Sequence, residues 1–393
     1  MSQVFDVAII GGGIQGAGTA QAAAAAGYSV ILFEQTGIGT GTSSRSSKLI
    51  HGGLRYLESG QFGLVRKALL ERAVLLRLAP ELVRLAPFYI PVFTTTRRRP
   101  WQIRLGLSLY ALLGNLTPAA RFRKLPKADW AHLDGLVADG LQAVFMYQDA
   151  QTDDQALTRA VTASAVALGA ELRCPAQVTD ISAGESGFTL GYNQQGKPAT
   201  CQAGVVVNAA GPWVNQLLGR VTPPVRGLDV DLVQGSHLVL DKPAPAGIYY
   251  VEAPRDRRAV FIMPWLGKTL IGTTETAYDG DPAAVRVLAQ EEAYLLEVYR
   301  HYFPTDNVTV VDRFAGLRVL PRAGHSFFHR PRDTIIHQEN AVPGLVTLYG
   351  GKLTGYRATA QEVLAVIRPL LPKKQPLADT ADLPLTPVTG PLG

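Results

Sequence analysis

The stretch 5–34, FDVAIIGGGIQGAGTAQAAAAAGYSVILFE, decides the fold of this chain. An apolar run leads into a glycine cluster, and a run of small residues then leads into a second apolar run. This order predicts a strand, a tight turn, a helix and a second strand. The glycines Gly11, Gly13 and Gly16 follow the spacing G-x-G-x-x-G. We expect Gly11 to permit the turn, Gly13 to let a pyrophosphate approach the backbone, and Gly16 to bring the helix close to the sheet.

The predicted helix presents free N–H groups and the positive end of its dipole near Ile14, and both favour phosphate. Glu34 follows Gly16 by 18 residues, at the end of the second strand. Its carboxylate can accept hydrogen bonds from both ribose hydroxyls and would repel a 2′-phosphate. The alternative is a close-packed turn without a ligand, because G-x-G-x-x-G alone is a weak signal. The complete unit favours a dinucleotide with free ribose hydroxyls, FAD or NAD.

Length and composition indicate a globular protein with two interleaved domains. The chain has 393 residues, of which 47% are hydrophobic and 18% charged. Cys174 and Cys201 are its two cysteines and form no C-x-x-C pair, so we expect neither a disulfide framework nor a metal site. No basic leader precedes the first strand and no apolar run reaches about 18 residues, so we expect a cytosolic protein without a membrane-spanning helix.

The basic charge is concentrated in one window. Residues 97–128 contain eight basic residues and no acidic residue, although the whole chain has a net charge of only +6. This pattern argues against general nucleic-acid binding and indicates one basic patch. The apolar segment 101–113 lies inside this window, and its spacing favours a helix over a strand. It is either an ordinary buried segment or a surface helix that dips into a bilayer with anionic head groups.

The remaining pattern predicts further elements around the first unit. The strand 204–208 is expected beside that unit, and the antiparallel runs within 232–276 are expected to form one wall of a pocket. A single G-x-G-x-x-G implies one dinucleotide and a small-molecule electron donor, which favours FAD over NAD. Helices are expected at 153–168, 284–302 and from 350 to about 370, followed by an unstructured tail.

Seven motifs resemble the FAD-dependent glycerol-3-phosphate dehydrogenase family, in that family's order and from Phe5 to about Leu370. They are GGGIQGAG, SSRSSKLIHGGLRYLE, NAAGPWV, QGSHLVL, FIMPWLGKTLIGTTE, GLRVL and YGGKLTGYR. The resemblance implies an α/β fold, in which a glutathione-reductase-like FAD-binding Rossmann domain is interleaved with an antiparallel-sheet substrate domain. We expect the FAD-binding domain at 1–86, 148–231 and 311–372, the substrate and membrane-facing domain at 87–147 and 232–310, and a flexible tail at 373–393.

The resemblance also implies an activity and partners. The family oxidises sn-glycerol 3-phosphate to dihydroxyacetone phosphate and passes electrons from the flavin to membrane quinone. It strengthens the bilayer interpretation of 101–113 and places the protein peripherally on the cytosolic face of the inner membrane. Bacterial members usually continue into a C-terminal helical domain, which we expect this chain to lack. The oligomeric state therefore stays open.

The substrate residues follow from phosphate chemistry and the resemblance together. A phosphate dianion needs more than one fixed cation, and guanidinium matches its geometry. The resemblance brings Arg55 and Arg318 to one pocket, with Tyr56 beside them and Arg332 or Arg330 as a third cation. Lys352 is expected at a helix N-terminus, where its charge would stabilise an anionic reduced flavin or contact the substrate.

A proton must leave the substrate hydroxyl while hydride leaves carbon. His237 is the candidate base because imidazole titrates near the working pH, and His51 is its competitor. The expected catalytic residues are His237, Arg318 and Lys352. The expected FAD contacts are Gly11, Gly13, Ile14, Gly16, Glu34, Ser43, Ser44, Lys48, Leu49, His51, Ala209, Gly211, Gly351, Lys352, Leu353 and Thr354.

Two other functions fit the same sequence. One is a related flavin oxidase of an amine or a 2-hydroxy acid, in which an arginine holds a carboxylate and oxygen accepts the electrons. The other is a membrane-associated flavin-binding protein without turnover.

Overall fold

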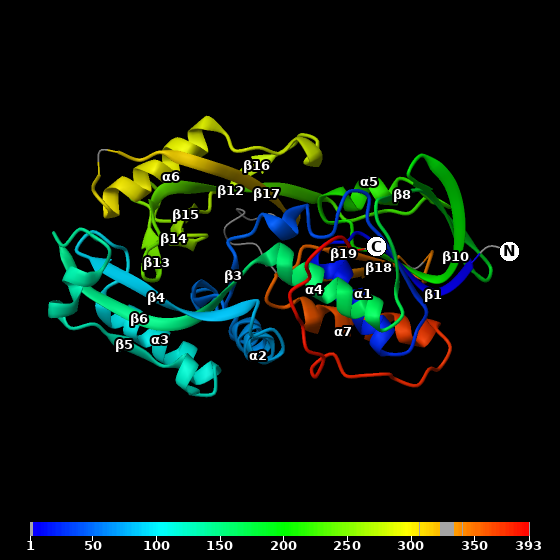
Figure 1. Cartoon of the computed structure of the whole chain (residues 1–393), viewed down its shortest axis with the longest axis horizontal. Helices are drawn as coiled ribbons and strands as arrows, with labels where there is room; N and C mark the ends of the chain where they lie inside the picture. The colour runs from blue at the N-terminus through cyan, green and yellow to red at the C-terminus, as the bar shows by residue number, and fades with distance from the viewer. Residues whose placement is uncertain (1–2, 306, 323–333, 340, 393) are drawn as a thin grey trace.

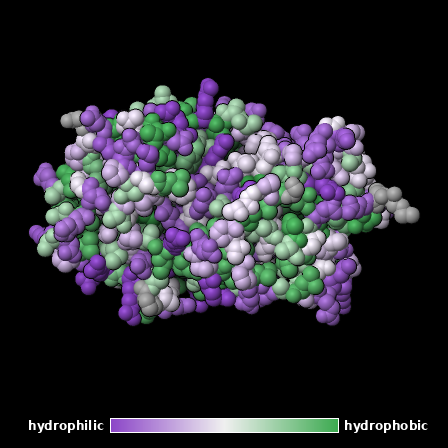
Figure 2. Space-filling model, viewed as in Figure 1, coloured by the Kyte–Doolittle hydropathy of each residue, from purple (hydrophilic) through white to green (hydrophobic). Residues whose placement is uncertain are grey.

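The computed structural model describes residues 3–305, 307–322, 334–339 and 341–392. Two sheets form two lobes side by side, and both chain termini lie in the lobe that contains α1, α4 and α7 (Figure 1). Hydrophilic and hydrophobic residues are interspersed over the face drawn in Figure 2. Arg330 and Arg332 lie outside the described residues, so their predicted contact with phosphate stays a prediction.

The first sheet is built around the strand that the opening motif predicts. β1 (Gln3–Ile10) lies between β2 (Val30–Phe33) and β10 (Lys197–Asn208), and all three run parallel. This confirms the prediction that the strand ending at Asn208 returns beside the first unit. The other strands of this sheet are β7 (Glu171–Arg173), β8 (Ala176–Gly184), β9 (Gly187–Gln194), β11 (Val221–Thr222), β18 (Ile335–Gln338) and β19 (Leu345–Tyr349).

Small side chains let helices pack closely against this sheet. α1 (Ile14–Ala25) packs against α4 (Asp154–Ala167) and α7 (Tyr356–Ile367). A Cβ on Gly18 would lie 2.6 Å from the ring of Tyr356, so this glycine permits the close approach of α7. The short α5 (Val214–Leu218) follows β10.

The second sheet is largely antiparallel, as predicted for 232–276, and its role as a wall of a pocket stays a prediction. Its longest strand, β12 (Val230–Pro243), pairs with β15 (Lys268–Gly272), β16 (Thr276–Tyr278) and β17 (Val310–Pro321). The boundary predicted at residue 311 falls inside β17, which pairs with β12 in this sheet, and the predicted domain division stays a prediction. The remaining strands are β3 (Leu49–Ile50), β4 (Val83–Phe93), β5 (Phe122–Lys124), β6 (Leu141–Thr152), β13 (Ile248–Glu252) and β14 (Ala259–Trp265).

Three helices accompany the second sheet. α6 (Ala289–Tyr302) packs on β12 and β15, whereas α2 (Phe62–Leu78) and α3 (Pro100–Leu113) pack on β4 and β6. The helix predicted at 101–113 is confirmed as α3. The helix predicted from 284 begins at Ala289, after a short turn at Pro282–Ala284.

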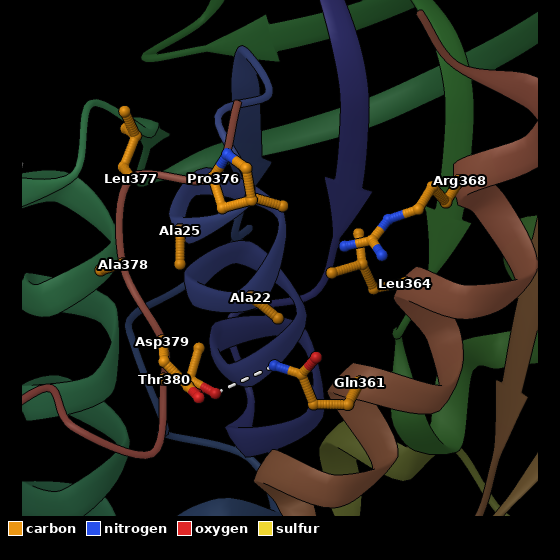
Figure 3. A pocket seen from close by; sticks show the side chains of 11 residues that line it. Ala22, Ala25, Gln361, Leu364, Arg368, Pro376, Leu377, Ala378, Asp379 and Thr380 are labelled. Atoms are coloured by element: carbon orange, nitrogen blue, oxygen red, sulfur yellow. Dashed lines mark hydrogen bonds between the residues drawn. The ribbon is translucent and has the colours of Figure 1, made fainter. Parts of the chain in front are cut away.

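The C-terminal tail, which we predicted to be flexible, contains no helix or strand among its described residues but is docked onto α1 and α2. The N–H of Leu377 donates to the carbonyl of Ala25 at 2.7 Å, and the N–H of Leu385 donates to the carbonyl of Leu78 at 2.7 Å. Leu385 is only 3% exposed. Gln361 of α7 donates to the Thr380 hydroxyl at 2.9 Å (Figure 3). The amino-acid composition suggested disorder because composition contains no information on contacts between distant segments.

A groove of about 370 Å³ remains between this tail, α1 and α7 (Figure 3). It is lined by Ala22, Gln361, Leu364, Arg368 and Asp379, among others. None of the predicted site residues lines it. The groove therefore belongs to the packing of the tail rather than to the candidate active site.

Candidate active site

The backbone of the glycine loop packs tightly against itself and against Ala209. Gly11 has a φ of +114°, and a Cβ there would lie 2.5 Å from the carbonyl oxygen of Ala209. A Cβ on Gly16 would lie 1.8 Å from the carbonyl oxygen of Gly11. These two positions exclude any side chain, as the sequence predicted for a turn that lies against both helix and sheet.

The N-terminus of α1 is available to an anion. Gly13 is the N-cap residue, no acidic side chain lies in the first turn, and the N–H of Ile14 donates to Ser43 Oγ at 2.9 Å. A Cβ on Gly13 would lie 3.2 Å from that same oxygen, so the missing side chain leaves the loop open. Helix N-termini of this kind bind phosphate through free N–H groups and the helix dipole.

Glu34 lies beside this loop. Its Oε2 accepts the N–H of Gly12 at 2.8 Å, and its Oε1 accepts the N–H of Thr36 at 2.8 Å. Oε1 also accepts the Thr36 hydroxyl at 3.0 Å, whereas Oε2 keeps a second lone pair that a ribose hydroxyl can use. The carboxylate is therefore positioned by the loop that would carry the pyrophosphate.

We call the glycine loop 11–16 together with Glu34 the cradle. The ends of the two neighbouring parallel strands β1 and β10 meet at this cradle. Ile10 is in register with Asn208, and the N–H of Ala209 donates to the carbonyl of Ile10 at 2.9 Å. Gly211 has a φ of +54°, which turns the chain away after β10. Ala209 and Gly211 thus lie at the carboxyl edge of the sheet, where such folds bind nucleotides.

The segment after the cradle contains a buried ion pair that the sequence did not reveal. Lys48 Nζ lies 2.6 Å from Asp154 Oδ1 and donates to the carbonyl of Ser44 at 2.5 Å. It also lies over the rings of Trp265 and Phe314, 5.1 and 5.0 Å from their centroids. The charge of Lys48 is therefore neutralised by Asp154, and its predicted contact with a cofactor stays a prediction. Leu49 is buried in β3.

His237 is buried on the second sheet. Its Nε2 is 2.9 Å from Ser47 Oγ, and its ring stacks on Phe314 at 4.9 Å. Nδ1 has no hydrogen-bond partner among the described residues. Burial, followed by the charges of Arg318 and Lys48, lowers the pKa of His237 to about 3. The imidazole is therefore neutral and can accept a proton.

His51, Arg55, Tyr56 and Lys352 form a second group. Lys352 Nζ lies 3.9 Å from the ring centroid of Tyr56, and Arg55 Cζ lies 5.5 Å from the same centroid. Burial, followed by the charges of Lys352, Arg55 and Arg72, lowers the pKa of His51 to about 4. Three cations therefore act on this imidazole, and the local electrostatic potential favours an anion.

The loop before α7 brings Lys352 to this group. α7 begins at Tyr356, so the prediction that Lys352 lies in its first turn is wrong. Gly350 and Gly351 have φ angles of +76° and +117°, which turn the chain after β19 and delay the helix. Thr354 Oγ1 accepts the N–H of His51 at 3.0 Å, which ties this loop to the loop that carries Arg55. Leu353 is half-buried beside these residues.

Gln15 connects the two loops to the glycine loop, a contact that no sequence motif indicated. Its Nε2 donates to the carbonyl of Lys352 at 3.4 Å, and a Cβ on Gly351 would lie 2.5 Å from that nitrogen. The first turn of α1 is therefore in direct contact with the segment that carries Lys352.

Arg318 lies near His237. It pairs with Glu275 at 2.9 Å, and Glu275 also pairs with Arg258 at 3.2 Å. Its charge lowers the pKa of His237, whereas the pKa of His51 is lowered by Lys352, Arg55 and Arg72 instead. Among the described residues, the predicted cations thus form two groups.

A row of paired residues connects the two groups. Phe261, Gly272, His237 and Phe314 lie opposite one another on four adjacent strands of the second sheet. Directly paired residues point to the same face. The ring of His51 contacts Phe261 edge-on at 6.2 Å, so both groups lie along one face, about two strand spacings or 10 Å apart.

The other face of β12 is occupied by a carboxylate network. Glu291 of α6 accepts hydrogen bonds from Ser236 and Thr274, each at 2.7 Å, and from Thr276 at 2.8 Å. These hydrogen bonds outweigh the effect of burial, so the pKa of Glu291 is lowered. The network fixes β12 behind His237.

The fold and the cradle define an FAD-dependent oxidoreductase. A family model described as FAD dependent oxidoreductase matches residues 6–357. A glycerol-3-phosphate dehydrogenase of Pseudomonas aeruginosa is 37% identical over 98% of this chain and 75% of its own length. A D-erythritol 1-phosphate dehydrogenase of Brucella abortus is 34% identical over 94% of this chain and 75% of its own length.

A solved glycerol-3-phosphate dehydrogenase of Bacillus halodurans, in complex with FAD, superposes with a TM-score of 0.75. It is 28% identical and is matched over 97% of this chain and 67% of its own length. The chain belongs to the FAD-dependent glycerol-3-phosphate dehydrogenase family, and its cofactor is FAD. The expected fold class and cofactor are thereby confirmed.

The cradle fits this cofactor. The first turn of α1 with Gly13 would hold the pyrophosphate, and Glu34 would hold the adenosine ribose. Ser43, Ala209 and Gly211 border the same edge of the sheet. The contacts of individual residues with FAD stay predictions.

Proposed function

We propose that this chain oxidises sn-glycerol 3-phosphate to dihydroxyacetone phosphate. Relatives at 37% and 36% identity are named glycerol-3-phosphate dehydrogenases. The observation that carries the proposal is the group of His51, Arg55, Tyr56 and Lys352, in which cations from segments about 300 residues apart in the chain act on one imidazole. Such a group suits a dianionic phosphate.

In this proposal, Arg55 and Lys352 bind the phosphate of the substrate. The guanidinium of Arg55 offers paired donors, and the ammonium of Lys352 acts as a point charge. Both cations lie over the ring of Tyr56. The phosphate end of the substrate is then fixed, and its secondary alcohol extends along the sheet towards His237.

His237 is the proposed base for the hydroxyl proton. Its pKa of about 3 in the free protein reflects burial and the positive charges of Arg318 and Lys48. A phosphate dianion entering the pocket offsets part of that positive charge, which raises the pKa and makes the imidazole a better proton acceptor. Glu275 holds the Arg318 guanidinium at 2.9 Å, in reach of the same space.

FAD, when bound, supplies the acceptor for the hydride that leaves the substrate carbon. The pair of electrons in the C–H bond leaves as hydride, the hydroxyl proton goes to His237, and the carbon becomes a ketone. Lys352 supplies positive charge next to this reaction. The proton then returns to solvent when the product leaves.

We propose quinone as the onward acceptor and a peripheral position on an anionic bilayer, on the cytosolic face. α3 supports this proposal, because its outer side is apolar: Trp101 is 66% exposed and Leu105 is 63% exposed, with Leu112 on the same side, and Leu116 just after the helix is also exposed. The basic residues at 97–99 flank its start. Apolar side chains bordered by cations suit an interface with anionic lipid. Within the described residues, no helix is both long enough and apolar enough to cross a membrane.

A steady-state assay with product identification tests the proposed function. The FAD-loaded protein is supplied with sn-glycerol 3-phosphate and a soluble dye acceptor, and dihydroxyacetone phosphate is the expected product. D-erythritol 1-phosphate is assayed in parallel because one relative is named for it. A higher kcat/KM for D-erythritol 1-phosphate would make that compound the preferred substrate. Turnover of amines or 2-hydroxy acids, with none of either phosphate ester, would refute a phosphate substrate. Stoichiometric hydrogen peroxide without a need for dye would assign oxygen as the acceptor.

A further inference from the structure

The loop 51–56, which carries Arg55 and Tyr56, is fixed by hydroxyl groups from distant segments. The N–H of His51 donates to Thr354 Oγ1 at 3.0 Å, and the N–H of Gly52 donates to the Tyr110 hydroxyl at 2.8 Å. Gly53 has a φ of +78°, so the loop turns sharply directly after these two anchors. The position of Arg55 therefore depends on contacts outside the loop.

The Tyr110 hydroxyl is itself oriented by a buried ion pair. It donates to Asp149 Oδ2 at 2.6 Å, and Asp149 pairs with Arg72. Tyr110 is 1% exposed and Asp149 is fully buried. Burial raises the pKa of Tyr110 well above its usual value, so the phenol keeps its proton. Because that proton goes to the carboxylate, the oxygen lone pair is directed to the Gly52 amide.

The packing at Gly52 leaves the loop no room to approach Tyr110 more closely. A Cβ on Gly52 would lie 2.6 Å from the Tyr110 hydroxyl oxygen and 2.8 Å from the side chain of Leu69. Burial raises the pKa of Asp149, and the Gly52 amide is among the groups that oppose this rise, so the carboxylate is near enough to receive the amide if the hydroxyl is removed. Loss of the hydroxyl therefore shifts the loop rather than leaving it in place.

We infer that Tyr110 is a positioning residue for the phosphate-binding loop. Tyr110 is held by the Asp149–Arg72 pair and accepts the Gly52 amide, and these contacts determine the positions of Arg55 and Tyr56. Because Tyr110 belongs to α3, it connects this helix to the proposed substrate pocket. This inference rests on the proposed function, in which Arg55 binds phosphate. A purely structural role would predict lower stability without a change in substrate affinity.

Tyr110→Phe tests the inference, with Tyr147→Phe as the matched control. Tyr147 is buried, its ring packs edge-on against Tyr110 at 5.8 Å, and its hydroxyl makes no hydrogen bond within the described part of the chain. For Tyr110→Phe we expect KM for sn-glycerol 3-phosphate to rise about tenfold with kcat changed little, since the Gly52 amide shifts towards Asp149 and displaces the loop that carries Arg55. FAD content should match the wild type, and Tyr147→Phe should leave KM unchanged.

Amide hydrogen exchange of the peptide spanning 51–57 supplies a readout that needs no turnover. Tyr110→Phe should speed exchange there, and Tyr147→Phe should not. Gly52→Ala displaces the same contact from the loop side and should raise KM equally, which keeps the test valid if Tyr110→Phe fails to fold. Unchanged KM and exchange in either folded variant would overturn the inference. If wild-type protein fails to turn over glycerol 3-phosphate, the proposed function fails, while the exchange comparison still decides the role of Tyr110.

Discussion

Removing the guanidinium of Arg55 should weaken substrate binding without affecting FAD binding. Arg55 is one of the charges that lower the pKa of His51 to about 4, because it repels the protonated imidazole. The same charge would attract a phosphate dianion in this place. A hydrogen-bonded charge pair of this kind contributes about 1.5–3 kcal/mol after solvent screening. Arg55→Ala should therefore raise KM for sn-glycerol 3-phosphate roughly ten- to a hundredfold.

The assay is the anaerobic rate of flavin reduction as a function of substrate concentration, with FAD content measured on the same samples. Arg55→Lys keeps the charge but loses paired donors, so its KM should fall between those of wild type and Arg55→Ala. Arg84→Ala, at an exposed arginine of β4, serves as the matched control and should leave KM unchanged. Equal losses of FAD content and substrate affinity in Arg55→Ala would refute the reasoning, because Arg55 would then belong to the cofactor site.

Four further predictions follow from the site. His237→Asn should slow flavin reduction at saturating substrate, and an unchanged rate would move the role of base to His51. Asp154→Asn should lower the free energy of unfolding by about 3–5 kcal/mol, as expected when a buried pair loses one charge; a melting temperature like the wild type's would contradict a buried ion pair with Lys48. The pKa of Glu291 lies below its usual 4.5, so its stabilising effect is complete above that pH and is lost as the pH falls through the lowered pKa. In acid denaturation, Glu291→Gln should thus flatten the pH dependence below 4.5, and an unchanged curve would disprove the shift. Leu105→Glu should weaken binding to anionic vesicles while dye-linked activity is kept, and unaltered vesicle binding would leave the apolar side of α3 without this role.

Sequence patterns predicted those elements of the fold that depend on residues close together in the chain. The glycine spacing, Glu34 and the apolar runs gave the strand, turn and helix of the cradle, because backbone geometry permits few residues there. The antiparallel strands and α3 followed from periodicity in the same way. The motifs around Arg55, His237 and Lys352 could be recognised because their order resembles that of a known family.

Pairings between distant segments could not be predicted. Lys48 and Asp154 are separated by 106 residues, and Gly52 and Tyr110 by 58, so neither pair leaves a periodic trace in the sequence. The docking of the tail could not be predicted for the same reason, since it depends on α1 and α2. Lys352 was placed at the start of a helix because helical spacing cannot show that two preceding glycines adopt positive φ angles.

Anaerobic titration of the FAD-loaded protein with sn-glycerol 3-phosphate tests whether the site oxidises this phosphate ester. We expect the oxidised flavin absorption band to disappear with one substrate consumed per flavin, while glycerol, which lacks the phosphate, leaves the band intact. Persistence of the band at millimolar sn-glycerol 3-phosphate, or equal reduction by glycerol, would contradict a site built to hold a phosphate dianion between Arg55 and Lys352.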